Sequence, residues 1–277
     1  MGLTAAFLGV ASVHLSDGQT DLLIDGFFSR PSLLKAGFTR VSTDVVAVKE
    51  GLSRAGISRL AAVLVGHSHY DHALDAPEIV RQTGAILIGS ESTLNIGRGY
   101  GLADEEMVLV REREVLSFGH FRVTFFHSMH NRTYLARGEI RKPLIPPAHI
   151  SVYRDGKCYS ILVEHPEGSI LVQDSAGYRQ GSLEGARANT VLLAAAGLGR
   201  APASYRDEYF HETAIVVGAK RVVPIHYDDF TRPLSDPPQL FPQWVDDIPS
   251  SLRFLQQSAE KAGMRYEIWR PYERYPL

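Results

Sequence analysis

Residues 61–72 read Ala-Ala-Val-Leu-Val-Gly-His-Ser-His-Tyr-Asp-His, an apolar run that ends in three histidines and an aspartate. The first five residues are apolar and partly β-branched, which predicts a short buried strand ended by the glycine. Side chains two positions apart on an extended chain point the same way, so His67 and His69, with Asp71 if the chain stays extended, can converge. His72 is adjacent to Asp71 and must face elsewhere. The spacing therefore predicts two neighbouring sites for zinc or a first-row neighbour, one using His67 and His69, the other Asp71 and His72.

The surrounding sequence alternates between strand and helix patterns. A helix at 76–83 between strands at 61–65 and 85–89 predicts a right-handed crossover between parallel strands. The histidines would then lie at the carboxyl end of a strand, where open α/β sheets usually carry their sites. We expect further strands at 3–15, 22–25, 108–116, 121–126, 150–154, 159–165, 169–173, 190–196, 221–225 and 265–269, further helices at 45–55, 207–218 and 250–262, and a surface loop at the glycines 97, 99 and 101.

The segment His-Ser-His-Tyr-Asp-His resembles the HxHxDH signature of the metallo-β-lactamase-fold metal-dependent hydrolases. Within that family the chain is similar to the branch of ascorbate-6-phosphate lactonase-like proteins and N-acyl-phosphatidylethanolamine phospholipase D, and not to the true β-lactamases. The resemblance implies an α/β fold, a four-layer αββα sandwich, and one domain that spans residues 1–277.

Four further segments resemble those that complete the family's metal centre. The third histidine of the first site would be His130 or His127, and alignment by the loop favours His130. Asp174 lies in Asp-Ser-Ala-Gly, which matches the segment of the bridging aspartate, although a glutamine replaces the usual preceding glycine. His226 lies in Pro-Ile-His-Tyr, similar to the last histidine segment. Asp25 ends Leu-Leu-Ile-Asp-Gly and would orient a ligating imidazole from the second shell, or simply end a strand.

The resemblance implies two divalent metal ions, with zinc expected first and manganese or iron also compatible. The implied ligands are His67, His69 and His130 at one site, Asp71, His72 and His226 at the other, and Asp174 between them. Such a pair would generate a hydroxide from a shared water, with Asp71 as the general base. We expect hydrolysis of an ester-type bond, either a phosphodiester or a lactone. The alternatives are a non-haem di-iron redox protein on the same ligands and a non-catalytic metal-binding module.

Composition limits the partners of this 277-residue chain, which is 44% hydrophobic and 22% charged. The formal net charge of -2 gives no reason to expect a nucleic-acid partner. Cys158 is the only cysteine, so no intramolecular disulfide can form and a cytoplasmic location fits. No apolar run is long enough for a membrane span, and we therefore expect a small soluble substrate.

Two irregular segments could border the site. Residues 133–149 are basic and proline-rich and resemble an insertion near the mouth, from which His149 could reach the site. Residues 231–250 could form a lid or a substrate wall, or only wrap the structure. A phosphate could be held by Arg132, Arg137, Arg141 and Lys142, although charged loops are usually only solvated.

Overall fold

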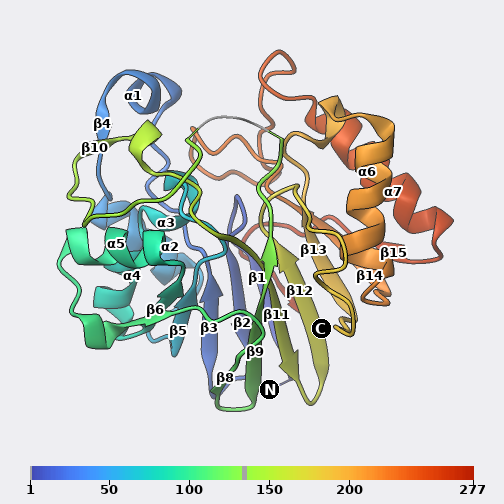
Figure 1. The fold of residues 1–277 in the computed structure, drawn as a ribbon, viewed down its shortest axis with the longest axis horizontal. Helices are drawn as coiled ribbons and strands as arrows, with labels where there is room; N and C mark the ends of the chain where they lie inside the picture. The colour runs from blue at the N-terminus through green and yellow to red at the C-terminus, as the bar shows by residue number, and fades with distance from the viewer. Residues whose placement is uncertain (1, 133–135) are drawn as a thin grey trace.

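The computed structural model describes residues 2–132 and 136–277. Two seven-stranded β-sheets pack face to face, and helices cover their outer faces (Figure 1). The predicted four-layer αββα sandwich is confirmed. Residues 133–135 of the predicted irregular segment lie outside the described residues.

The first sheet is built mainly from the N-terminal half of the chain. Strands β3, β5, β6 and β7 are parallel, which confirms the predicted crossover, while β16, β1, β2 and β3 pair antiparallel. In spatial order the strands are β16 (Arg274–Pro276), β1 (Thr4–Phe7), β2 (Val13–Ser16), β3 (Asp21–Ile24), β5 (Ala62–Leu64), β6 (Ile86–Gly89) and β7 (Met107–Leu109).

The second sheet follows in sequence. Strands β8, β9, β11 and β12 pair antiparallel, and β12, β13, β14 and β15 are parallel. In spatial order they are β15 (Arg265–Tyr266), β14 (Arg221–Ile225), β13 (Thr190–Ala194), β12 (Gly168–Gln173), β11 (Cys158–His165), β9 (Phe121–Ser128) and β8 (Val115–Phe118). A separate pair joins β4 (Arg40–Val41) to β10 (Ala148–His149).

Alternating side chains of β5 show the layering. Ala62 and Leu64 belong to the core cluster shared with the second sheet, whereas Val63 belongs to the cluster beneath the helices on the other face. All three side chains are fully buried. Because both faces of β5 are covered, apolar residues are favoured at every position, and the strand is a continuous apolar run.

The helices divide between the two outer faces (Figure 1). The helices α2, α4 and α5 contribute buried side chains to the cluster outside the first sheet, and α6 and α7 contribute theirs beside the second. No helix among the described residues is long and apolar enough to cross a membrane. The α-helices are α1 (Leu33–Phe38), α2 (Val45–Arg54), α3 (Tyr70–Ala73), α4 (Ala76–Thr83), α5 (Glu91–Tyr100), α6 (Ala203–Phe210) and α7 (Ile248–Lys261), with 3-10 turns at Asp104–Glu106, Ile150–Val152 and Leu198–Arg200.

Several predicted strands were wrong. The expected strand at 3–15 is two strands, because Gly9 and Val10 adopt positive φ values of 94° and 53° and reverse the chain. The expected strand at 108–116 is also two, and the polar residues 111–114 carry the chain from the first sheet to the second. Residues 150–152 form a 3-10 turn rather than a strand. The last strand is shortened to β15.

Two predictions for helical regions also need correction. The expected helix at 207–218 begins earlier, as α6, and continues as a π-helix at His211–Ile215. The surface loop predicted at glycines 97, 99 and 101 is instead the end of α5, capped at its N-terminus by Ser90, whose side chain accepts the Thr93 N–H.

Helix α5 is held by the segment 140–144. Asn95 Nδ2 donates to the Ile140 carbonyl at 2.8 Å, and Leu144 N donates to the Asn95 carbonyl at 2.9 Å. A Cβ at Gly99 would overlap with the backbone of Leu144. Glycine is therefore required here by the close approach of two backbones, despite its low helix propensity.

Replacing Gly99 with alanine should lower the free energy of unfolding by about 1–3 kcal/mol, because the added methyl meets backbone that cannot rotate away. Urea denaturation would measure the change. Gly37→Ala in α1 is the matched control, since a Cβ there meets nothing within 4 Å. Equal stability of the two variants would contradict the packing argument.

Candidate metal centre

The predicted histidines follow β5 at its carboxyl end. After His69, which is extended (φ -63°, ψ 156°), the chain turns into the short helix α3. Asp71 and His72 therefore lie in a helical turn and not in an extended chain. The turn brings both side chains into a second cluster, and it leaves the His72 ring 3.9 Å from the His67 ring between centroids. Ser68 anchors this loop, because its Oγ lies 2.9 Å from Thr93 Oγ1 and 3.1 Å from Ser90 Oγ on α5.

His67, His69 and His130 form the first cluster. One ring nitrogen from each lies within 4.8 Å of the others, and His130 is 4.5 and 4.8 Å from His69 and His67 between ring centroids. The Nε2 atom of His69 lies 3.1 Å from the Ala136 carbonyl, which leaves Nδ1 for the cluster. Of the two histidines left open by the sequence, the structure brings His130 here and places His127 beside Arg179.

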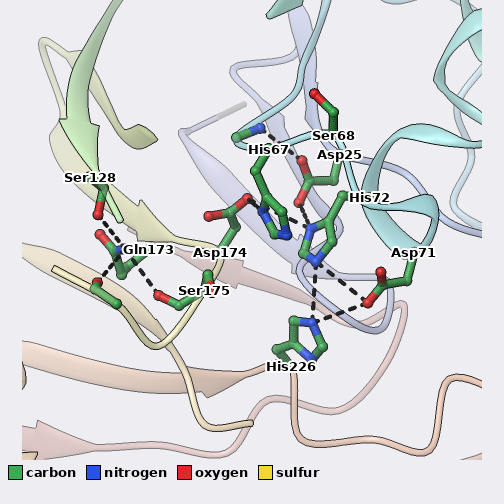
Figure 2. Close-up of polar contacts among 12 residues, drawn as sticks. Asp25, His67, Ser68, Asp71, His72, Ser128, Gln173, Asp174, Ser175 and His226 are labelled. Carbon is green, nitrogen blue, oxygen red and sulfur yellow. Dashed lines mark hydrogen bonds and ion pairs between the residues drawn. The ribbon is translucent and has the colours of Figure 1, made fainter. Parts of the chain in front are cut away.

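Asp71, His72 and His226 form the second cluster (Figure 2). The Nε2 atoms of His72 and His226 are 3.2 Å apart, and Asp71 Oδ2 lies 3.6 and 3.4 Å from them. His226 follows β14 and has a positive φ of 52°. Strands of both sheets therefore end at this cluster.

Asp174 lies between the two clusters, at the end of β12. Its Oδ2 is 2.6 Å from His67 Nδ1 and 3.7 Å from His72 Nδ1. A Cβ at Gly66 would overlap with this carboxylate. The glycine that ends the apolar run thus provides the space that Asp174 occupies.

Asp25 contacts the second cluster from behind (Figure 2). Its Oδ2 accepts a hydrogen bond from His72 Nδ1 at 2.7 Å, and its Oδ1 accepts the Gly66 N–H at 3.1 Å. A proton on Nδ1 leaves the Nε2 lone pair of His72 free to face Asp71 and His226.

The charges of the clusters follow from burial and from neighbouring groups. Burial, and then the His72 ring, lowers the pKa of His67 well below its usual range. Burial also lowers the pKa of His130, so these rings are neutral and can act as ligands. Burial raises the pKa of Asp174 to about 6. Burial would likewise raise the pKa of Asp71, but His72 and His226 hold it below its usual value.

The donor atoms suit divalent cations. Of the eight buried side-chain atoms without a hydrogen-bond partner in the described chain, four belong to these clusters: His67 Nε2, His130 Nδ1, His226 Nδ1 and Asp174 Oδ1. Buried polar atoms are nearly always satisfied, so such a concentration calls for a ligand. Imidazole nitrogens and carboxylate oxygens are what zinc, manganese and iron accept.

A cavity of about 880 Å³ opens onto both clusters, with His69, Asp71, His130 and His226 in its wall. The rest of the wall is mostly apolar, with two cationic side chains and the carboxylate of Asp246. It includes Tyr70, Arg132, Tyr153, Arg200, Tyr205, Phe230, Phe241 and Val245. A second cavity of about 610 Å³ is lined by Arg132, Arg137, Tyr178 and Arg179 among others.

The irregular segments contribute unequally to these cavities. Phe241 and Val245 of the segment 231–250 line the larger one. His149 also lines it, but belongs to neither donor cluster and contacts Ser151 Oγ at 2.9 Å. Of the four proposed phosphate contacts, Arg132 and Arg137 line a cavity, whereas Arg141 pairs with Glu139 at 3.3 Å. Lys142 is exposed.

Gln173 is a site residue that the sequence did not reveal. Its Nε2 donates to Ser128 Oγ, Ser175 O and Gly177 O at 2.8–3.0 Å, and its Oε1 accepts from Ser160 Oγ. Ser175 Oγ in turn accepts the Asn131 N–H at 3.0 Å, next to His130. The residue that replaces the expected glycine thus connects the Asp174 loop to the His130 loop. The sequence showed that a glutamine replaces the usual glycine, but not the partners that give Gln173 this role.

Comparison with known proteins gives a relative named "UPF0173 metal-dependent hydrolase" from Heliobacterium modesticaldum. It is 27% identical over 231 residues, which cover 82% of this chain and 84% of the relative. Among solved structures, Igni18, a metallo hydrolase from Ignicoccus hospitalis, matches with a TM-score of 0.56 and 14% identity over 99% of both chains. CmlA, a diiron beta-hydroxylase from Streptomyces venezuelae, matches with a TM-score of 0.60 and 14% identity over 99% of this chain and 54% of CmlA.

The family assignment rests on a match over half of the chain. Residues 7–147, which include β2 to β9 and the histidine motif, match the family model described as the metallo-beta-lactamase superfamily. The two-sheet fold and the convergence of the motif residues agree with that match. The chain therefore belongs to the metallo-beta-lactamase superfamily.

Proposed function

We propose that the protein, a metal-dependent hydrolase of this superfamily, uses a dinuclear metal centre to cleave an ester-type bond in a small soluble substrate. The observation that carries the proposal is the convergence of seven imidazole and carboxylate side chains beside one cavity. Zinc is the first metal to test, followed by manganese and iron. The residues that would bind one ion are His67, His69 and His130, and those that would bind the other are Asp71, His72 and His226. Asp174 would bind both.

Two divalent cations, when bound, acidify a shared water and polarise the bond to be cleaved. Asp71 accepts the proton of the attacking water, because its carboxylate lines the cavity beside His72 and His226. Asp25 fixes the His72 ring through the 2.7 Å hydrogen bond to Nδ1. The mostly apolar wall lowers the local dielectric constant, which strengthens electrostatic interactions at the reacting atoms.

The cavity wall favours a substrate with an apolar part and an anionic or strongly polar group. Phe230 lies 5.5 Å from the His226 ring and 4.9 Å from Phe241, which forms an aromatic surface beside the second cluster. Arg132 stands over the Tyr205 ring at 5.5 Å and can contact a phosphate oxygen. We therefore place phosphodiesters and lactones first among the ester-type substrates.

Elemental analysis tests the centre directly, on untagged protein purified without chelator and dialysed to remove loosely held ions. Two zinc or manganese ions per chain, with metal-dependent turnover of a phosphodiester or a lactone from a panel, would support the proposal. Two irons with a redox-active spectrum would replace it with redox chemistry of the kind named for CmlA. Protein that binds no metal after reconstitution would overturn it.

Replacing Asp71 with asparagine should lower kcat by at least about 10²-fold, since a positioned base contributes roughly 10²–10⁴-fold. Steady-state kinetics on the best substrate of the panel would measure this, with the metal content of each preparation determined in parallel. Asp207→Asn, an exposed aspartate on α6, is the control. An unchanged kcat with two ions still bound would refute the assigned role.

Replacing Asp25 with asparagine should weaken metal retention by about 10–100-fold. Both carboxylate oxygens of Asp25 accept hydrogen bonds, from His72 and Gly66, and an amide can accept only one of them. Asparagine tolerates the positive φ of 54°, so the backbone should not change.

Competition with a metal-sensitive dye would measure the metal affinity of Asp25→Asn. Asp21→Asn is the matched control, because Asp21 is at the opposite end of β3, the strand that Asp25 follows, and bonds to His14 at 2.8 Å. The same affinity in both variants would show that Asp25 does not position His72.

A further inference from the structure

A third group of imidazole and carboxylate side chains lies at the opposite end of the sandwich. Asp17 is in the turn between β2 and β3, His120 is in the turn between β8 and β9, and His165 is the last residue of β11. One donor atom from each lies within 4.8 Å of the others. In Figure 1 these turns are at the lower end of the sheets, whereas α3 lies at the upper end.

The two distances from Asp17 to the rings match the spacing of ligand atoms around a tetrahedral cation, and the two ring nitrogens lie within 4.8 Å of each other. Asp17 Oδ2 is 3.2 Å from His120 Nδ1 and 3.5 Å from His165 Nε2. Metal–ligand bonds of about 2.0–2.1 Å at tetrahedral angles separate the ligand atoms by about 3.3 Å. The cluster of Asp71, His72 and His226 has the same spacing, with distances of 3.2–3.6 Å.

The three side chains are also oriented toward a common point. Asp17 Oδ1 accepts the Gln19 and Thr20 N–H groups at 2.8 and 2.7 Å, which leaves Oδ2 for the two rings. The side chain of His165 is only 6% exposed, yet its Nε2 has no hydrogen-bond partner within the part of the chain that the structure describes. The side chain of His120 is 58% exposed and gives solvent access to the fourth position.

We propose that Asp17, His120 and His165 form a separate divalent-cation site, with zinc as the preferred ion. Two imidazoles and one carboxylate suit zinc better than calcium or magnesium, which take oxygen ligands. Asp17 lies in a turn of the first sheet, His120 lies in a turn of the second, and His165 is on a strand of the second. A cation here ties the two sheets together at the end remote from the cavity, and it stabilises the folded chain because the unfolded chain lacks the site.

The competing occupant of this space is a proton. The Glu167 N–H lies 3.2 Å from His165 Nδ1, and an acceptor there places the ring proton on Nε2, facing Asp17. For zinc to bind at Nε2, the ring proton must move to Nδ1, and this tautomer gives up the contact with the Glu167 N–H. A hydrogen-bonded triad without metal is therefore the alternative that the experiment must distinguish.

The test is a zinc titration of protein that already carries its tightly held metals. Isothermal calorimetry measures the uptake of zinc, and thermal unfolding measures the change in Tm. The wild-type chain should take up one more zinc ion than His120→Ala. At about 100-fold excess over Kd its Tm should rise by about 5 °C, and the variant should lose this rise. His120 is mostly exposed, so its replacement should not unfold the protein. His211→Ala, whose side chain is 61% exposed, is the control and should behave as wild type.

His72→Ala separates this proposal from the proposed function. That variant should lose metal from the catalytic clusters and keep the additional zinc and its Tm shift. The same zinc uptake and the same Tm shift in the wild type and His120→Ala would overturn the proposal and leave a hydrogen-bonded triad only.

Discussion

The hydrogen bond from His72 Nδ1 to Asp25 Oδ2 is the contact on which the candidate metal centre depends. Asp25 is completely buried, and a buried carboxylate is costly unless its oxygens are paired. Its two oxygens pair with His72 and with the Gly66 N–H, so one side chain joins the end of β3 to both parts of the loop after β5. The cost of burying this charge is thus offset only when the motif loop is folded, and the ring of His72 is then fixed with Nε2 toward Asp71 and His226.

A second buried network holds the other side of the centre. Arg30 Nη2 donates to Asp228 Oδ2 at 2.6 Å, Asp228 Oδ1 accepts the Val10 N–H at 2.8 Å, and the Val10 carbonyl accepts the His226 N–H at 2.5 Å. Val10 and His226 both have positive φ values, which are unfavourable for side chains with a Cβ, above all for a β-branched one. Such conformations persist when several surrounding contacts hold them in place, and they concentrate at functional sites. Through Val10, the buried ion pair between Arg30 and Asp228 holds His226 in its positive-φ conformation.

The difference between local and distant contacts explains what the sequence could predict. His67, His69, Asp71 and His72 were identified because their spacing follows from the geometry of a strand end. Asp174 and His226 were indicated only by family resemblance, since nothing local relates them to the motif. Arg30 and Asp228 were missed because their roles come from partners far along the chain, which are 198 residues apart for Arg30 and Asp228 and 218 for Val10 and Asp228. The role of Gln173 was missed because it depends on Ser128 and Ser160, which lie on other strands. The prediction of a loop at the glycines of α5 was wrong because tertiary packing overrides helix propensity.

The same types of donor side chain occur at both ends of the sandwich, but their surroundings differ. At the cavity end the donors come from the ends of four strands, β5, β9, β12 and β14, and are largely buried, so their charges act in a medium of low dielectric constant. At the turn end His120 is mostly exposed, and solvent screens the group. Catalysis by charge stabilisation requires a pre-organised, water-excluding environment, which only the first end provides. The second end has the features needed to bridge two sheets and lacks, among the described residues, the walls needed to enclose a substrate.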